Sequence, residues 1–483
     1  MLSKLTGRER VWIALTLILA VCLFFGGRSL PVGLAKTSTK DDLYDQLKIF
    51  TDVMAIVQRD YVTPVSNKKL IEGAIKGMLQ TLDPHSGYLD PDFYQDLQVQ
   101  TKGEFGGLGI EITIKDGLLV VVAPMEGSPA EKAGIKAGDA IVKIEGKFTK
   151  DFSLVDAVKR LRGPRGTPIT ISVQRKGVPG LIDITVVRDI IKVTSVRSRY
   201  LGDGLGYVRI SQFMEQTADD LHKALEKLKA ASDNKELRGI ILDLRNNPGG
   251  LLTQAIRVSD MFLDGGLIVY TDGRVESQKQ KFFAHREGTE PDYPIIVLIN
   301  GGSASASEIV AGALQDHGRA LVLGTQSFGK GSVQTITPLE NGGALTLTTA
   351  LYYTKSGRSI QATGIKPDIV VEPEIQEEPV KQLKPHHRPQ PIREGDLPGA
   401  IKNPTEHDDS SGLRKINKTP VEQKELQVLR IETVDLNEWL KRDKQFQRAY
   451  DLLKTFDVFR DVRQARTEPQ AGEREAASLL AAN

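Results

Sequence analysis

The sequence predicts a multidomain α/β protein, and three observations lead to that prediction. With 483 residues, the chain is too long for one ordinary hydrophobic core, so two to four domains are expected. Between residues 206 and 324, apolar strands alternate with helical segments and glycine-rich turns, which is typical of an α/β domain. Residues 106–188 instead contain several short strands and only short helices, which indicates a separate β-rich module.

The composition limits the classes of function. With 40% hydrophobic and 26% charged residues, the chain as a whole is neither disordered nor a multi-span membrane protein. The 64 Lys and Arg residues nearly balance the 62 Asp and Glu residues, so we expect no nucleic-acid partner. A single cysteine excludes a disulfide within the chain and a cysteine-based zinc site.

Residues 1–35 carry an export pattern. Basic residues precede an apolar run over residues 11–25, which is typical of a secretory signal. The run is shorter than the roughly 20 residues that a membrane-spanning helix needs. Cleavage after Ala35 and retention as an uncleaved anchor are both open. We therefore expect an exported protein of the periplasm or cell envelope, soluble or anchored, that meets the membrane only through this segment.

Residues 41–100 are predicted to be mainly helical. In the first helix, apolar residues recur every three or four positions, at Tyr44, Leu47, Phe50, Val53, Ile56 and Val57. Residues 68–81 predict a second helix, and the segment LDPHSGYLDP then turns. The apolar stripe packs either on the protein itself or on a second copy, and the pattern leaves both open.

Residues 103–190 form the β-rich module. The strand GLGIEI is followed by a turn and by the apolar strand LLVVV. A short helix begins at Pro129 with Ser128 as its N-cap, a second helix covers residues 153–162, and two alternating strands follow. With these motifs, the module resembles a PDZ domain of the bacterial protease type.

In that resemblance, one glycine-rich turn matches the loop that binds a carboxylate. It consists of Gly107, Leu108, Gly109 and Ile110. Consecutive backbone N–H groups in such a turn form a nest for the carboxylate at a protein C-terminus, while the adjacent strand edge pairs with the peptide. The resemblance therefore implies that the module binds the C-terminal tails of protein substrates.

Three strands of the α/β region end in glycine-rich turns. Residues 239–244 precede RNNPGG, residues 295–299 precede NGGSASAS, and the strand ALVLG precedes TQSFGKGS. In open α/β sheets, sites gather where loops leave the carboxyl ends of the strands. The sequence therefore predicts one site built from these three turns.

The residues available there favour a serine–lysine pair. None of the seven histidines has the strand-end position of a triad base. Ser305 lies in the helix-opening turn, and Lys330 lies in the next strand-end loop, 25 positions on. A lysine accepts the proton of a serine only when it is neutral, and apolar burial lowers its pKa. Ser303 and Ser307 compete for the nucleophile role on chemistry alone.

From about Tyr44 to Glu372, the chain resembles the carboxyl-terminal processing (tail-specific) peptidases, a Ser/Lys-dyad family. The motifs are DLRNNPGG, NGGSASASEIVAGAL, GTQSFGKGSVQT and GIKPDIVVEP. The resemblance implies that Ser305 is the nucleophile, Lys330 the general base, and Gln334 the residue that orients the lysine. It places the oxyanion hole at the amides of Ala306 and of a glycine in the NNPGG loop, for which we choose Gly250.

The resemblance also implies a role for an arginine of the PDZ-like module. Arg162 falls where the family has an arginine that couples the position of the PDZ domain to the active site, and Arg165 is the alternative. We therefore expect an exported endopeptidase that needs no metal or cofactor, and the resemblance implies that it is self-inhibited until substrate or an adaptor binds. Its expected partners are proteins with accessible C-termini, an adaptor, and a second copy held through the helical terminal segments.

Other interpretations are weaker. Residues 324–330 nearly match a P-loop, but Gly331 stands where a Ser or Thr must bind Mg²⁺. Asp243 and Asp316 are expected to be structural. A non-catalytic PDZ scaffold on a protease fold is the alternative function, and the presence of Ser305, Lys330 and Gln334 together argues against it.

The composition changes again after residue 372. Residues 373–424 are rich in Pro, charge and polar side chains, which predicts a disordered linker. Residues 425–466 regain an apolar period of three to four and predict a tethered C-terminal helix. This helix serves docking or assembly, or packs on the protease core, and the sequence does not distinguish these alternatives.

Overall fold

The computed structural model describes residues 40–115, 117–233, 235–373, 392–405 and 434–467. The predicted export segment, residues 1–35, lies outside them. The chain divides into two compact units, one up to Ile75 and one from Lys76 onward. Among the described helices, none combines the length and the apolar character needed to cross a membrane.

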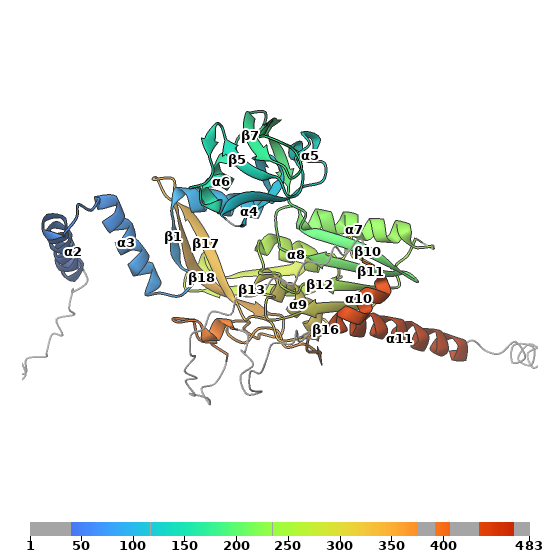
Figure 1. Ribbon diagram of the computed structural model, residues 1–483. Helices are drawn as coiled ribbons and strands as arrows, with labels where there is room; N and C mark the ends of the chain where they lie inside the picture. The colour runs from blue at the N-terminus through green and yellow to red at the C-terminus, as the bar shows by residue number, and fades with distance from the viewer. Residues whose placement is uncertain (1–39, 116, 234, 374–391, 406–433, 468–483) are drawn as a thin grey trace, which may run out of the picture. The chain divides into compact units, whose positions relative to one another are not determined.

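The first unit contains the predicted N-terminal helices (Figure 1). They are α2, Lys40–Asp60, and most of α3, Asn67–Gln80, whose last residues belong to the second unit. The apolar stripe of α2 is exposed, with Tyr44 70% and Val53 53% accessible. The two helices confirm the prediction for this region, and a second copy on the stripe stays a prediction.

The β-rich module is a six-stranded sheet with two short helices. Its strands run in the order β3-β4-β5-β7-β8, and β6 pairs with β5. The strands are β3 Ile110–Lys115, β4 Leu118–Pro124, β5 Ala140–Ile144, β6 Lys147–Phe148, β7 Pro168–Gln174 and β8 Ile182–Val187. The helices are α5, Pro129–Lys132, and α6, Leu154–Leu161, and Ser128 and Ser153 cap them through their hydroxyls. The two helices and the main strands thus follow one another in the order that the sequence predicts, with β3 at one edge of the sheet.

A helix and a short ribbon connect this module to the rest of the second unit. Helix α4, Pro91–Lys102, ends at Gly103, whose φ of 71° is left-handed. The ribbon that follows pairs β2, Glu104–Gly107, with β9, Asp189–Lys192. The chain therefore enters and leaves the module at one place.

The central sheet has six strands in the order β10-β11-β12-β15-β16-β19. From β11 onward the neighbours are parallel, and only β10 is antiparallel. The strands are β10 Val196–Gly202, β11 Leu205–Ile210, β12 Gly239–Asp243, β15 Ile295–Ile299, β16 Leu321–Gly324 and β19 Ile369–Val370. The helices between them are α7 Thr217–Ala231, α8 Leu252–Asp260 and α9 Ala306–Asp316. Because β12 and β15 are entirely buried, their apolar runs fit a sheet covered on both faces.

A second, antiparallel sheet has the order β1-β18-β13-β14, with β17 paired to β18. The strands are β1 Gly87–Leu89, β13 Gly266–Gly273, β14 Gln280–Ala284, β17 Ser332–Pro338 and β18 Ala344–Thr354, and the 3-10 turn η1, Glu276–Gln278, lies before β14. Strand β1 comes from the predicted helical region and pairs with β18. Part of residues 41–100 therefore joins the core, as the sequence predicts.

The C-terminal helices pack on the central sheet, which decides between the open alternatives. They are α10, Leu436–Arg442, and α11, Lys444–Thr467. Neighbouring residues of β12 point to different faces, since Ile240 packs with α7, α8 and α9 and Ile241 packs with Trp439 and Phe446. Figure 1 shows α7 and α11 on opposite sides of the sheet. The tethered segment is thus the second covering layer of the core.

The prediction of a disordered linker over residues 373–424 is wrong for residues 392–405. These residues include the 3-10 turn η2, Glu394–Asp396, and Glu394 is fully buried. Composition predicted disorder because the stretch is polar, but its polar groups have partners on the core, such as Arg393 with Gln326.

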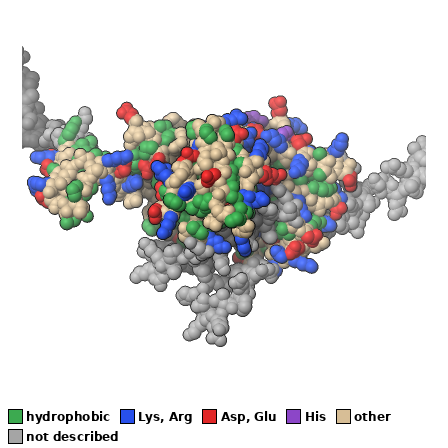
Figure 2. Space-filling model, turned by 45° about the horizontal axis from the view of Figure 1, so that its top comes forward, with side chains coloured by type: hydrophobic (Ala, Val, Ile, Leu, Met, Phe, Trp, Pro, Cys, Tyr) green, Lys and Arg blue, Asp and Glu red, His purple; other side chains and the backbone are tan. Residues whose placement is uncertain are grey.

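On the face in Figure 2, basic and acidic side chains intermix, and no large area has one sign.

Candidate active site

The three glycine-rich turns meet at one edge of the central sheet. The Ala304 amide donates to the Asn247 carbonyl at 3.0 Å, which joins the turns after β15 and β12. The Phe328 amide donates to the Ser303 carbonyl at 3.0 Å, which joins the turns after β16 and β15. The sheet therefore brings together the three turns that the sequence singled out.

The structure separates the three candidate serines. Ser303 and Ser307 are fully buried, and their hydroxyls donate to the carbonyls of Leu244 and Asn247, at 2.8 and 2.9 Å. Ser305, between them, is partly exposed and has φ 54° and ψ −112°. A side-chain-bearing residue at positive φ costs of order 1–3 kcal/mol and is concentrated at functional sites. This backbone presents the Ser305 side chain at the start of α9.

Two backbone amides next to Ser305 are available to a ligand. The Gly249 amide is occupied, because it donates to Asn247 Oδ1 at 2.9 Å. Within the described chain, neither the Gly250 amide nor the Ala306 amide donates a hydrogen bond. A Cβ on Gly249 would lie 2.9 Å from the Ser305 Cβ, so only glycine lets this loop approach the serine. The predicted pair of oxyanion donors is thus unoccupied.

Lys330 lies in the loop between β16 and β17 and is largely buried. Burial lowers the pKa of Lys330, and the negative charges of Glu394, Glu308 and Asp83 oppose that shift. In the described part of the chain, no hydrogen bond joins its ammonium group to Ser305 or Gln334. Lys330 therefore loses its proton more readily than lysine in water, and the neutral form is the one that a general base needs.

Gln334 lies on β17 beside the lysine loop. Its amide donates to Ser332 Oγ at 3.0 Å and to Thr348 Oγ1 at 3.4 Å. The Thr348 hydroxyl in turn donates to Asp83 Oδ1 at 3.1 Å. Gln334 thus belongs to a polar chain close to Lys330, and its role in orienting the lysine stays a prediction.

Glu308 is a residue of the site that the sequence reasoning missed. Its Oε2 accepts hydrogen bonds from the amides of Ser305, at 2.7 Å, and Lys330, at 2.9 Å. Its Oε1 accepts from the Gly329 amide at 2.7 Å and from the Ser327 hydroxyl at 2.6 Å. One carboxyl group therefore holds the serine turn and the lysine loop together.

The Glu308 carboxyl group is fully buried, and all four groups that donate hydrogen bonds to it are uncharged. Burial raises the pKa of Glu308 to about 7, against the four hydrogen bonds that lower it. A signal was present in the sequence, because Glu308 is an acid immediately before the apolar run IVAGAL of a buried helix. Glu308 is also three residues after Ser305, which is the usual position of a helix-capping acid. The sequence therefore suggests only a local capping role and gives no sign of the contacts with Gly329 and Lys330.

Asp243 has the structural role that the sequence predicts. It is fully buried at the end of β12, and it accepts from the Tyr207 hydroxyl at 2.7 Å and from Arg245 Nη2 at 2.6 Å. Burial by itself would raise the pKa of Asp243, but Arg245 lowers it overall. Arg245 also binds Asp443, which fixes the C-terminal helices to the strand before the NNPGG loop.

The described residues contain one group that could approach a metal ion, His222, Glu226 and Glu290. The Lys229 ammonium already lies 2.9 Å from both Glu226 and Glu290. A cation is thus in place between the two carboxylates, and the group lies outside the three turns.

Comparison with known proteins assigns the chain to a family. Residues 204–371 match the model of peptidase family S41, residues 120–175 match a PDZ domain, and residues 31–93 match the activating protease CtpB N-terminal domain. A carboxy-terminal-processing protease of Bartonella bacilliformis is 52% identical over 376 residues, which cover 78% of this chain and 85% of that protein. The chain belongs to peptidase family S41.

Further relatives place it among the carboxy-terminal processing proteases of that family, which are serine-type peptidases. The carboxy-terminal processing protease CtpA of Bacillus subtilis is 38% identical, covering 73% of this chain and 74% of that protein. A carboxyl-terminal-processing protease of Synechocystis is 36% identical, covering 75% and 88%. A solved photosystem II D1 C-terminal processing protease is 31% identical, covers 67% of this chain and 86% of that chain, and has a TM-score of 0.40.

In this S41 peptidase, the glycine-rich loop of the PDZ domain is open to a ligand. Within the described residues, the Leu108 and Gly109 amides donate no hydrogen bond. Gly109 has φ 74°, and a Cβ there would lie 2.5 Å from the Ser128 Cβ. The neighbouring strand β3 is an edge strand, and Ile114 on β3 and Val155 on α6 are 46% and 60% exposed. These features suit β-strand addition by a peptide, and the binding itself stays a prediction.

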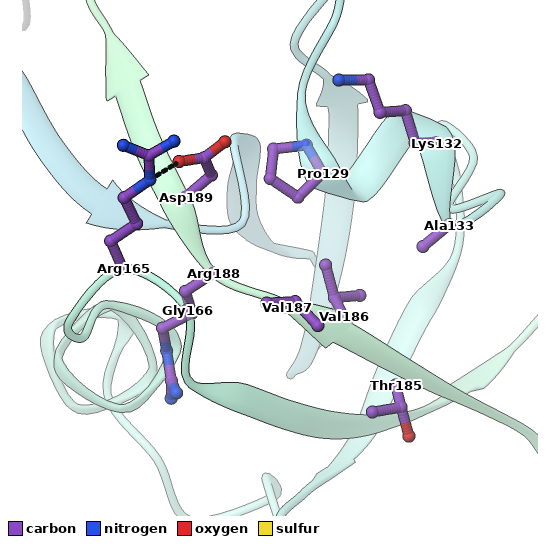
Figure 3. A pocket seen from close by; sticks show the side chains of 10 residues that line it. All are labelled: Pro129, Lys132, Ala133, Arg165, Gly166, Thr185, Val186, Val187, Arg188 and Asp189. Atoms are coloured by element: carbon purple, nitrogen blue, oxygen red, sulfur yellow. Dashed lines mark ion pairs between the residues drawn. The ribbon is translucent and has the colours of Figure 1, made fainter.

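A different part of the PDZ domain contains a pocket of about 460 Å³ (Figure 3). It lies between α5 and the end of β8, and the predicted loop at residues 107–110 does not line it. At its rim, Arg165 Nε lies 2.7 Å from Asp189 Oδ1, and the Arg165 side chain is 72% exposed. Arg165 is therefore paired with the first residue of the connecting strand β9.

Arg162 connects the PDZ domain to α4. It follows α6 directly, and its Nη1 donates to Asp96 Oδ1 of α4 at 2.6 Å. Its guanidinium group also lies 4.9 Å from the centre of the Phe105 ring. Strand β1, just before α4, pairs with β18. Arg162 is thus better placed than Arg165 to couple the PDZ domain to the core, and the coupling stays a prediction.

Proposed function

We propose that this S41 peptidase is an exported endopeptidase that binds the C-terminal tails of protein substrates through its PDZ domain and cleaves them with Ser305 and Lys330. The observation that carries the proposal is the link made by Glu308, which accepts from the amides of both Ser305 and Lys330. The two unoccupied amides beside Ser305, those of Gly250 and Ala306, support the same chemistry.

The proposed reaction passes through an acyl-enzyme. Neutral Lys330 accepts the proton of the Ser305 hydroxyl, and Oγ attacks the carbonyl carbon of the scissile bond. The amides of Gly250 and Ala306 stabilise the oxyanion that forms. Lys330 then gives the proton to the leaving amine and later takes one from the water that hydrolyses the ester. Gln334 orients the lysine, and no metal or cofactor takes part.

The remaining parts of the proposal concern delivery and location. The amides of Leu108 and Gly109 receive the terminal carboxylate of the substrate, with Gly107 and Ile110 shaping the loop. Arg162 transmits the position of the PDZ domain to the core. The basic and apolar pattern of residues 1–35 supports export to the periplasm or cell envelope, as a soluble or an anchored protein. The proposed partners, besides substrate, are an adaptor and a second copy bound through the helical terminal segments.

Substitution of the dyad tests the chemistry. We expect Ser305→Ala and Lys330→Ala each to abolish cleavage of an unfolded protein such as casein, and the exposed controls Ser277→Ala and Lys366→Ala to leave it unchanged. Trapping of an ester intermediate by mass spectrometry checks the acyl-enzyme. Equal casein cleavage by the wild type and Ser305→Ala would remove the basis of the proposal.

The pH profile tests the base. Because burial lowers the pKa of Lys330, activity should rise with pH through an ionisation below that of lysine in water, which is 10.5. A pair of peptides with a free and an amidated C-terminus tests the PDZ loop, since amidation removes the carboxylate. We expect the free acid to be cleaved faster; equal rates would contradict recognition of the C-terminus.

A further inference from the structure

Residues 392–405 lie beyond the part of the chain that matches the S41 model, and they pack on the lysine loop. The Glu394 amide donates to the Phe328 carbonyl at 3.2 Å, and Arg393 Nη1 donates to Gln326 Oε1 at 2.7 Å. Both acceptors are in the loop that carries Lys330. This segment thus approaches the site after the chain has completed the peptidase core.

The Glu394 carboxylate is fully buried at this contact. His85 Nε2 lies 2.8 Å from both of its oxygens, and Gln361 Nε2 donates to Oε1 at 3.1 Å. His85 belongs to the turn before β1, and Gln361 follows β18. Since a buried carboxylate without partners costs several kcal/mol, these contacts are needed to keep Glu394 in place.

Gln361 extends this network to the neighbour of the lysine. Its Oε1 accepts from the Gly331 amide at 2.9 Å, while its Nε2 also donates to the Ile401 carbonyl at 3.2 Å. On the other side, Glu308 accepts from the amides of Gly329 and Lys330. The lysine loop is therefore held from two sides, by the core through Glu308 and by the C-terminal segment through Glu394.

Glu394 also acts on the lysine by its charge. Three carboxylates oppose the effect of burial on the pKa of Lys330, and Glu394 has the largest influence, ahead of Glu308 and Asp83. The charged or titratable groups that face Glu394 are His85 and Lys330. Without the Glu394 charge, the pKa of Lys330 would fall further below its usual value.

We propose that Glu394 is a positioning residue for the proposed catalytic base: with His85 and Gln361, it forms a polar clamp that holds the loop of Lys330. The inference rests on the proposed function of Lys330. In this arrangement the C-terminal segment does more than cover the core. Its residue Glu394, which lies outside the range that matches the S41 model, fixes the position of Lys330 and influences the pH at which Lys330 loses its proton.

Glu394→Gln in the full chain separates charge from shape, because the two side chains have nearly the same size. The acid limb of the pH profile of kcat/KM should move to lower pH by about one unit. Maximal kcat should fall, with little change in KM, since Glu394 is not placed to contact the substrate. Asp396→Asn is the matched control, because among the described residues this exposed carboxylate of the same turn accepts a hydrogen bond only from the Arg393 amide. It should leave the profile unchanged.

A second readout does not depend on proteolysis. The Lys330 amine is allowed to react briefly with acetic anhydride at a series of pH values, and mass spectrometry measures the labelled fraction of the peptide that carries it. The midpoint should fall by about one pH unit in Glu394→Gln and stay at the wild-type value in Asp396→Asn. Glu394→Asp keeps the charge and should restore the wild-type midpoint with a lower kcat.

His85→Ala supplies a further test, in which the labelling midpoint should not fall, and it remains available if Glu394→Gln does not fold. It removes a partner of the carboxylate and leaves the charge, so the labelling midpoint should stay or rise. Unchanged midpoints in Glu394→Gln, with only a loss of stability, would overturn the inference and leave the Ser305 and Lys330 results untouched. If Ser305→Ala proves as active as the wild type, the proposed function fails, and the labelling experiment still decides on Glu394.

Discussion

Asp243 and Glu308 are both fully buried carboxylates beside the active-site turns, but their pKa values shift in opposite directions. Asp243 faces the guanidinium group of Arg245, whose charge holds its pKa below the usual range. Glu308 accepts four hydrogen bonds, all from neutral donors, and burial raises its pKa to about 7. The charge of the partners, and not the depth of burial, therefore decides which form of a buried acid is favoured.

The two regions also differ in what they hold together. Around Asp243, an ion network and an aromatic cluster fasten the C-terminal helices to the sheet, with Tyr207 donating to Asp243 and packing against Trp439. Around Glu308, hydrogen bonds fasten two loops to each other. The comparison predicts that damage to the first region reduces mainly stability, and damage to the second mainly activity.

The largest loss of stability is expected from Trp439→Ala. The Trp439 ring is 4% exposed and stacks on Phe446 with ring centres 3.8 Å apart. Removing a large buried side chain costs about 3–5 kcal/mol. Denaturant unfolding measures this loss of stability, and kcat of the folded enzyme should stay unchanged. Phe456→Ala on the following helix, α11, where the ring is 50% exposed, is the control and should cost about 0.5 kcal/mol or less. Equal costs would show that the helices do not pack as described.

Asp243→Asn should cost somewhat less, about 3 kcal/mol, because it leaves the buried Arg245 with one carboxylate partner in place of two. The matched control is Asp219→Asn, which breaks the half-exposed pair with Arg257 and should cost about 0.5 kcal/mol. Urea unfolding of the three proteins at neutral pH provides the comparison. A cost for Asp243→Asn no greater than that of the control would contradict the structural role of the network.

Glu308→Gln should cost about 1–3 kcal/mol of stability, since the new NH₂ group faces donors that then lack an acceptor. Activity should fall about 100-fold, because the serine turn and the lysine loop lose their common anchor and small displacements of reacting groups are costly. Casein cleavage measures the activity, with the exposed Glu340→Gln as the control. Unchanged kcat/KM would break the contrast between the two regions.

The pH dependence of stability gives a further contrast between the two carboxylates. The folded state raises the pKa of Glu308 from 4.5 to about 7, so the contribution of this group to stability is complete below pH 4.5 and is lost as the pH rises through 7. The slope is at most about 1.4 kcal/mol per pH unit. The cost of Glu308→Gln should therefore shrink between pH 5 and pH 8.

For Asp243, the contribution to stability is expected to change with pH in the opposite direction. Its pKa is lowered in the folded state, so its contribution is present above its unfolded value of 3.8 and is lost as the pH falls through the folded value. Unfolding curves of both variants and the wild type, from pH 3 to pH 8, test the two signs together. Costs that change in the same direction with pH would contradict the different charges assigned to the two sites.

The sequence by itself determined the elements that local pattern controls. Apolar strands that end in glycine-rich turns predicted the α/β domain and the edge of its sheet at which Ser305 and Lys330 lie. The PDZ strands and the caps at Ser128 and Ser153 followed from turn and capping residues, whose partners are only a few positions away. The resemblance added the roles of the residues, and the structure then distinguished Ser305 from its two neighbours by burial.

Only the tertiary structure decided which distant groups meet. Glu308 reads as an ordinary capping residue until its contacts 21 and 22 positions away are known. Glu394 lies in a stretch whose composition predicts a linker, and its partner His85 is 309 positions distant in the chain. The C-terminal helices had an apolar period but no indication of what it covers. The sequence pattern shows which local structure a residue favours. Burial and pairing of its side chain depend instead on the chain segments that surround it in space. Burial and pairing in turn decide the protonation and the position of the acids around Lys330.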